Sequence, residues 1–175
     1  MTAIHVTHDH IEALSMASQI IVLNEGRIEQ IGTPVEIYSR PRNLFVARFL
    51  GVVNVMTGTV ESDDGAARVS GTGWSVLGRP HGLLQGQGHA LIRPAAIRVL
   101  GEDDEANGNE LTVEVLDGAF HGDRWQFEVA SDSGERFKIH SDGALPAGTR
   151  IRISFPVDAC RVIPVAEAPD AAALP

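Results

Sequence analysis

The residues of this sequence that could do chemistry lie near its start, in Val6-Thr7-His8-Asp9. The preceding stretch, Ala3-Ile4-His5-Val6, has the composition of a strand end, and a helical pattern follows Asp9, so His8 is predicted to lie in a strand-to-helix turn. The ligands of α/β proteins bind at such turns, where an imidazole can hydrogen-bond an anionic group. Taken alone, a single histidine in this place is more often a capping or surface residue than a functional one.

The other candidate residues argue against metal and nucleic-acid chemistry. Four histidines of the later sequence have no zinc-type spacing: His81, His89, His121 and His140. Trp74 and Trp125 are predicted to lie in the core or at the rim of a β structure. A net charge of −9 and a pI near 5.1 disfavour a nucleic-acid surface, which needs clustered Lys and Arg. We therefore expect no metal site and no nucleic-acid partner.

The composition also indicates the cellular compartment. The single cysteine, Cys160, rules out an internal disulfide framework and fits a reducing environment. No apolar run approaches the ~20 residues that span a bilayer, and the start of the sequence lacks the basic and apolar pattern of a secretion signal. We expect a cytoplasmic protein with no direct membrane insertion.

The first fifty residues are predicted to alternate short strands with well-capped helices. The predicted elements are a helix over 10–17, strands over 20–23 and 27–31 joined by a tight turn, and helices beginning at 34 and 44. Asp9 is expected to N-cap the first helix, with Glu12 reaching back to the cap. Thr33 and Glu36 have the spacing of a capping box around Pro34 and begin the second helix.

Beyond Gly51 the sequence is rich in Gly and β-branched residues and contains an internal repeat. Residues 54–60 resemble 109–115, and residues 88–100 resemble 148–163. Each copy alone is too small to bury a good core. We therefore expect two small β-barrels, or one barrel-like sandwich made of both copies.

The run VTHDHIEALSMASQIIVLNEGRIEQIGTPVEIYSRPRNLFVARFLG resembles the segment that closes the nucleotide-binding domain of ABC importer ATPases, over nearly all of residues 4–51. In that family the histidine of the Thr-His-Asp element is the switch histidine. The resemblance implies that His8 would contact the γ-phosphate of ATP and help to hold the attacking water, because a donor aimed at a phosphoryl group stabilises charge in transfer. His8 is therefore the candidate catalytic residue, in a complete ATPase only.

Residues 51–165 resemble the barrel-type appendage known as the TOBE domain. The run Arg93-Pro94-Ala95-Ala96-Ile97-Arg98 is similar to its RPE-x-I-R element, with Ala95 where an acid is usual. Phe120-His121-Gly122-Asp123 before a strand at 125–129 also fits the family's pattern. In the family this domain pairs with its counterpart on a second ATPase subunit and can receive regulatory signals or ligands. The resemblance thus implies a homodimer through the β domain.

The sequence lacks the other ATPase motifs. It contains no G-x-x-x-x-G-K-[ST] loop, no apolar strand ending in Asp-Glu and no signature motif. His8 alone cannot bind or hydrolyse ATP, so we expect no ATPase activity and no cofactor for this chain by itself, with ATP and Mg²⁺ bound by the complete subunit. The chain is interpreted as a truncated gene product, a natural remnant or one piece of a split subunit.

These observations predict three segments, with an exposed acidic connector, Gly101–Gly108, inside the second. The segments are an α+β remnant of an α/β ATPase domain at 1–50, an all-β part with OB-like, TOBE-type barrels in tandem at 51–165 (repeats at about 51–100 and 109–165), and a flexible tail at 166–175.

The function predicted from the resemblance is that of the C-terminal region of the ATP-binding subunit of an ABC importer, coupling ATP hydrolysis to solute uptake. The partners would be permease subunits, which place it at the inner face of the plasma membrane, and a second ATP-binding subunit. Two alternatives stay open: a stand-alone module that binds a small ligand or oxyanion, and a non-functional remnant. The solute stays open among sulfate, ferric iron, polyamines and sugars.

Overall fold

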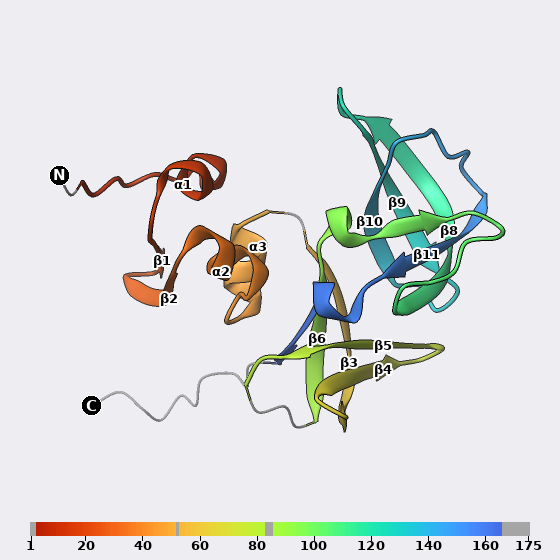
Figure 1. Ribbon diagram of the computed structural model, residues 1–175, viewed down its shortest axis with the longest axis horizontal. Coiled ribbons are helices and arrows are strands. Elements are labelled where there is room, and N and C mark those ends of the chain that lie inside the picture. Colours follow the sequence, from red (N-terminus) through yellow and green to blue (C-terminus); the bar gives the residue numbers. More distant parts are fainter. Residues whose placement is uncertain (1–2, 52, 83–85, 166–175) are drawn as a thin grey trace. The chain divides into compact units, whose positions relative to one another are not determined.

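The computed structural model describes residues 3–51, 53–82 and 86–165 (Figure 1). Internal contacts divide the chain into two compact units, Met1–Gly51 and Val52–Pro175. The flexible tail predicted for residues 166–175 lies outside the described residues.

The described part of the first unit confirms the predicted helices and hairpin. Its elements are α1 (His10–Met16), β1 (Ile20–Asn24), β2 (Arg27–Gly32), α2 (Pro34–Ser39) and α3 (Leu44–Phe49). The strand predicted at Ala3-Ile4-His5-Val6 is wrong. Ile4 and Val6 are 92% and 91% exposed, and no described residue pairs with this stretch. A β-strand needs a hydrogen-bonded neighbour, and this stretch has none in the described chain.

The second helix begins with the capping box that its sequence predicts. Thr33 Oγ1 accepts a hydrogen bond from the backbone N–H of Glu36 over 3.3 Å, and Glu36 Oε2 accepts one from the backbone N–H of Thr33 over 2.9 Å. The Thr33 N–H favours the charged carboxylate and so lowers the pKa of Glu36.

The core of the first unit is small, and one face of its hairpin is apolar and uncovered. Its buried residues are Val22, Ile37, Val46 and Leu50. On the other face of the hairpin, four apolar side chains form two cross-strand pairs and are between 50% and 59% exposed: Ile21 with Ile31, and Leu23 with Ile28. We call these four residues the hairpin apolar face.

The second unit contains one order of elements twice. The first copy has β3 (Asn54–Asp63), β4 (Ala66–Gly71), β5 (Trp74–Pro80), β6 (Gln87–Ile92), η1 (Pro94–Ala96) and β7 (Arg98–Leu100). The second has β8 (Asn109–Phe120), β9 (Trp125–Ser131), β10 (Arg136–Ser141), β11 (Arg150–Phe155), η2 (Val157–Ala159) and β12 (Cys160–Pro164). Four strands, a single 3-10 turn and a last strand therefore recur in each copy.

The two copies exchange their last strands. β12 of the second copy completes the closed barrel of the first, which has the order β12-β5-β4-β3-β6. β7 of the first copy is an edge of the second sheet, which has the order β10-β9-β8-β11-β7. In Figure 1 the blue end of the described chain accordingly returns beside β6. The predicted tandem of OB-like barrels is confirmed, with one barrel closed and the other a half-barrel.

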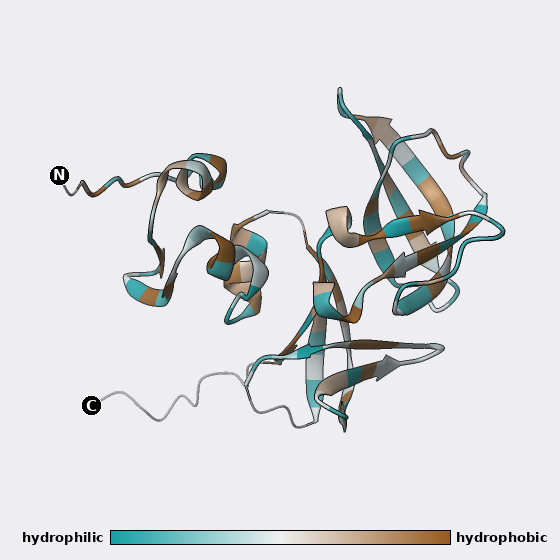
Figure 2. Cartoon of the chain, in the orientation of Figure 1, coloured by the Kyte–Doolittle hydropathy of each residue, from teal (hydrophilic) through white to brown (hydrophobic). Residues whose placement is uncertain are grey.

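One hydrophobic core joins the two copies. It combines residues from both sheets, among them Met56, Val76, Ile92, Val113, Phe137 and Phe155. Buried positions alternate with more exposed ones along β5 and β9, as expected for strands with one face on a core. Figure 2 shows the matching alternation of hydrophobic and hydrophilic residues along the strands. Each copy thus buries its inner face partly against the other.

Candidate functional site

His8 lies in a bend immediately before Asp9, the N-cap of α1. The residue is exposed, and its imidazole has no hydrogen-bond partner among the described residues. Its ring nitrogens are therefore open to solvent and available to a ligand.

The backbone after His8 is fixed by Asp9. Asp9 Oδ1 accepts hydrogen bonds from the backbone N–H groups of Glu12 and Ile11, over 3.1 and 2.8 Å. These two donors stabilise the ionised carboxylate and lower the pKa of Asp9. The predicted N-cap is confirmed.

The predicted partner of Glu12 is wrong. Glu12 does not reach back to the backbone N–H of Asp9, because that group donates to Thr7 Oγ1 over 3.0 Å. The Glu12 carboxylate instead lies beside the His5 ring, with His5 Nε2 3.2 Å from Glu12 Oε2. Thr7 and His5 both favour the charged carboxylate and lower the pKa of Glu12, with Thr7 having the larger effect. Sequence reasoning missed Thr7 and His5 as members of this site.

In the second unit, two buried asparagines join the copies. Asn54, 4% exposed, accepts a hydrogen bond at Oδ1 from the Lys138 N–H over 2.7 Å and donates from Nδ2 to the Lys138 carbonyl over 2.8 Å. Asn109, 7% exposed, does the same with Leu77, over 2.6 and 2.8 Å. Each asparagine begins the first strand of its copy and satisfies the N–H and the carbonyl of one residue in the other copy's third strand. The repeat in the sequence aligns Asn54 with Asn109 but does not indicate this role.

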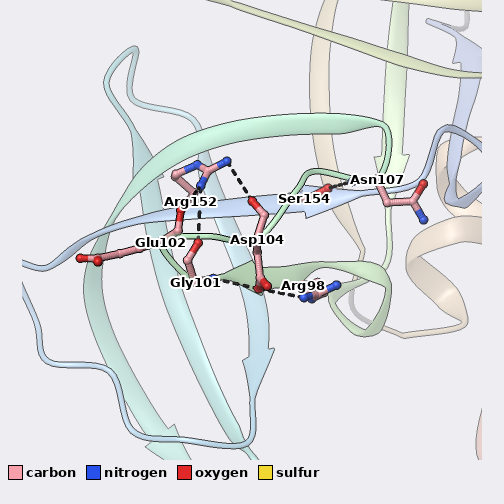
Figure 3. A network of polar contacts seen from close by, with 7 residues as sticks. All are labelled: Arg98, Gly101, Glu102, Asp104, Asn107, Arg152 and Ser154. Atoms are coloured by element: carbon pink, nitrogen blue, oxygen red, sulfur yellow. Dashed lines mark hydrogen bonds and ion pairs between the residues drawn. The ribbon is translucent and has the colours of Figure 1, made fainter.

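The acidic connector between the copies is held by an arginine (Figure 3). Arg152 on β11 donates from Nη1 to the carbonyls of Gly101 and Glu102, and from Nη2 to the Asp104 carbonyl, each over 3.4 Å. Its Nε donates to Glu110 Oε1 over 2.6 Å. Most connector residues are exposed, as predicted, but the backbone follows a defined path.

Asp104 completes this network from within the connector. Its Oδ2 accepts from the Gly101 N–H over 3.0 Å and from Arg98 Nη2 over 2.8 Å. These contacts lower the pKa of Asp104, the Gly101 N–H having the larger effect. Farther along, the Asn107 N–H donates to Ser154 Oγ over 3.0 Å. The charged groups of this network thus bind one another.

Three further properties of the described residues bear on the search for a site. Within the described residues, no group of three or more His, Cys, Asp or Glu is arranged to hold a metal ion. Among the helices of the same ranges, none combines the length and apolar content that a membrane span requires. Burial lowers the pKa of His140, one of the histidines without zinc-type spacing, and leaves its Nδ1 without a partner.

Comparison with known proteins gives one family match and several relatives. Residues 90–163 match the TOBE domain family. The chain is 32% identical over 174 residues to the spermidine/putrescine import ATP-binding protein PotA of Rubrobacter xylanophilus, covering 93% of the chain and 45% of that protein. It is 36% identical over 166 residues to the PotA of Methylococcus capsulatus, covering 89% and 43%.

A third relative is named for a different solute. The Fe(3+) ions import ATP-binding protein FbpC of Streptomyces coelicolor is 41% identical over 103 residues, covering 59% of the chain and 28% of that protein. The chain therefore spans less than half the length of the curated relatives it matches.

A solved structure shares the β fold. The cytoplasmic molybdate-binding protein ModG, solved with molybdate bound, matches with a TM-score of 0.52 and 15% identity, covering 62% of this chain and 94% of that one. At this identity the likeness concerns the fold alone.

Proposed function

Because the chain is a TOBE-type C-terminal part of an ABC importer ATP-binding subunit, we propose that it serves such a subunit in coupling ATP hydrolysis to solute uptake. The observation that carries this proposal is the position of His8, which is exposed, has no hydrogen bond among the described residues and lies immediately before the N-cap of α1. Relatives named for polyamines and for ferric ions match this chain, so the proposed role is one common to importers of different solutes.

His8 would act at the γ-phosphate of ATP. An imidazole N–H aimed at a phosphoryl oxygen stabilises charge that grows in the transition state, and the same ring can orient the attacking water. The described residues supply this one group and no cluster of carboxylates for Mg²⁺. ATP and Mg²⁺ would therefore be held by polypeptide that corresponds to the rest of the relatives' length.

The hairpin apolar face supports the same proposal. Four half-exposed apolar side chains on one face of a two-stranded sheet are costly to leave in water. The curated relatives are more than twice as long as the part that this chain matches. The remainder of the ATP-binding domain would cover this face and bring its phosphate-binding loop toward His8.

The β unit would provide the regulatory and dimerising part. It would pair with its counterpart on a second ATP-binding subunit, while permease subunits would hold the assembly at the inner face of the plasma membrane. This arrangement would place the chain in the cytoplasm.

Complementation in trans tests the proposal. The part of a PotA relative that this chain does not match would be coexpressed with this chain, and ATP hydrolysis and polyamine uptake measured. We expect both activities to require the two pieces together, and His8→Ala to lower kcat about a hundredfold while ATP binding changes little.

Failure of the two pieces to associate would support a non-functional remnant. Tight binding of molybdate, sulfate or tungstate by the chain without any complementation would support the stand-alone module instead. Equal losses of ATP binding and hydrolysis in His8→Ala would contradict the switch role.

A further inference from the structure

We propose that Thr7 and Glu12 are positioning residues that hold His8 in its working orientation, an inference that rests on the function proposed above. The Thr7 hydroxyl oxygen accepts a hydrogen bond from the Asp9 N–H over 3.0 Å. One hydroxyl thus ties together the residues on both sides of His8.

Glu12 links this turn to the helix. It lies in the first turn of α1, and its Oε2 lies 3.2 Å from His5 Nε2. The His5 and Glu12 side chains are 63% and 40% exposed, so their contact adds little to stability by itself. Its effect is geometric, because it joins the chain before His8 to the helix after it.

The second helix of the same unit provides a comparison. Glu36 occupies the third position of α2, as Glu12 does in α1, and it bonds both the backbone N–H and the hydroxyl of its own N-cap, Thr33. In α1 the N–H of the N-cap, Asp9, bonds Thr7 instead, and the Glu12 carboxylate contacts His5. The same residue type at the same helix position therefore closes a cap in α2 and fixes the His8 turn in α1.

The position of a catalytic donor strongly affects the rate. A donor must lie about 2.7–3.1 Å from the oxygen on which charge develops, and a misplacement of ~1 Å can cost about a hundredfold in rate. The His8 ring has no hydrogen-bond partner among the described residues. The direction of its Cα–Cβ bond is therefore set by the backbone that Thr7 and Glu12 hold.

The first test uses the full chain and needs no ATPase activity. The ¹H–¹⁵N heteronuclear NOE of residues 7–9 would be measured in wild type, Thr7→Val, Glu12→Ala, Glu12→Gln and Glu36→Ala. Thr7→Val and Glu12→Ala should lower the NOE at His8, whereas Glu12→Gln keeps an acceptor for His5 and should restore it. Glu36→Ala should affect α2 only. An unchanged NOE at His8 in both Thr7→Val and Glu12→Ala would overturn the proposal.

The second test uses the complemented subunit. Thr7→Val and Glu12→Ala should each lower kcat about tenfold, because each removes one orienting hydrogen bond. The KM for ATP should change less than twofold. Glu36→Ala should leave kcat at the wild-type level. If His8→Ala lowers kcat but Glu12→Ala does not, the positioning role is wrong and the proposed function stands. If His8→Ala has no effect, the proposed function fails, and the NOE test still decides whether the turn is held as described.

Discussion

Trp74 and Glu135 occupy equivalent positions in the two β copies and contact each other directly. Trp74 Nε1 donates to Glu135 Oε1 over 2.5 Å. Three positions after each of them lies a residue whose backbone is hydrogen-bonded by an asparagine of the opposite copy. This residue is Leu77 after Trp74 and Lys138 after Glu135. The contact therefore lies where the two copies meet, and Trp74 is 7% exposed in the shared core.

The stability contributed by Glu135 should depend on pH. Burial opposes its ionisation, yet hydrogen bonds from Ser131, Ser133 and Trp74 lower its pKa below the ordinary value of 4.5. A carboxylate with a lowered pKa stabilises the fold above its unfolded-state pKa and loses this effect as pH falls through the folded-state pKa.

The measurement is urea unfolding of wild type and Glu135→Gln between pH 7 and pH 2.5. The advantage of wild type over Glu135→Gln should be constant above about pH 5 and shrink below pH 4.5. Emission of Trp74 in a Trp125→Phe background should change over the same range. A difference that is independent of pH would contradict the assignment.

The two buried asparagines should be essential to the β unit. Asn54→Ala or Asn109→Ala removes the partners of one N–H and one carbonyl that are part-buried, so we expect each to cost about 2 to 4 kcal/mol in the free energy of unfolding. Asn107→Ala is the matched control, because Asn107 is exposed and bonds Ser154 through its backbone alone. Equal small effects at all three positions would show that these contacts do not join the copies.

The position of the Trp74 ring should tolerate only glycine at residue 71. A Cβ at Gly71 would lie 2.3 to 2.5 Å from atoms of the Trp74 indole, inside any permitted contact. Gly71→Ala should therefore displace the ring and lower stability by about 1–3 kcal/mol. Gly143→Ala, where a Cβ meets nothing within 4 Å, should change stability by less than about 0.5 kcal/mol.

Cys160 should report the opening of the exchanged strand β12. Burial raises the pKa of its thiol to about 12, so little thiolate exists at neutral pH. A thiol reagent should label the native chain only as fast as β12 detaches, and labelling should become rapid in denaturant. Complete labelling of the folded chain within seconds at pH 7 would mean that β12 is not held in the barrel.

The proposed pairing through the β unit predicts a discrete dimer. Sedimentation should show that this dimer survives deletion of residues 1–50. Association through the hairpin apolar face, by contrast, should be open-ended, sensitive to detergent and lost with that deletion. A monodisperse monomer of the full chain at tens of micromolar, where weak pairs form, would count against the dimer.

The elements that depend on local sequence were predictable, and those that depend on partners were not. Thr33 and Glu36 specify their helix start through contacts three residues apart, so the capping box follows from sequence. Glu12 has the same spacing from Asp9, but Thr7 competes successfully for the Asp9 N–H. The difference lies in one neighbouring residue, because a hydroxyl, Thr7, stands two residues before Asp9 whereas Ile31 stands two residues before Thr33.

The exchange of β7 and β12 was beyond prediction because it depends on partners. Alternation identifies strands and the repeat identifies equivalent ones, but neither says which sheet a strand joins. The apolar stretch Ala3-Ile4-His5-Val6 shows the reverse error, since its composition suits a strand for which the described chain provides no neighbour. Which strands pair with one another depends on contacts across the whole chain and not on local sequence.

The exchange of strands has a consequence for synthesis on the ribosome. The barrel begins with β3 at Asn54 and closes with β12, which starts at Cys160. At ~5–20 residues per second, the nascent chain passes several seconds with β5 and β6 made and no strand to lie between them. During this interval both edges can pair with other chains. Chaperone binding to ribosome-bound chains that end before residue 160 should therefore exceed binding to chains released in full.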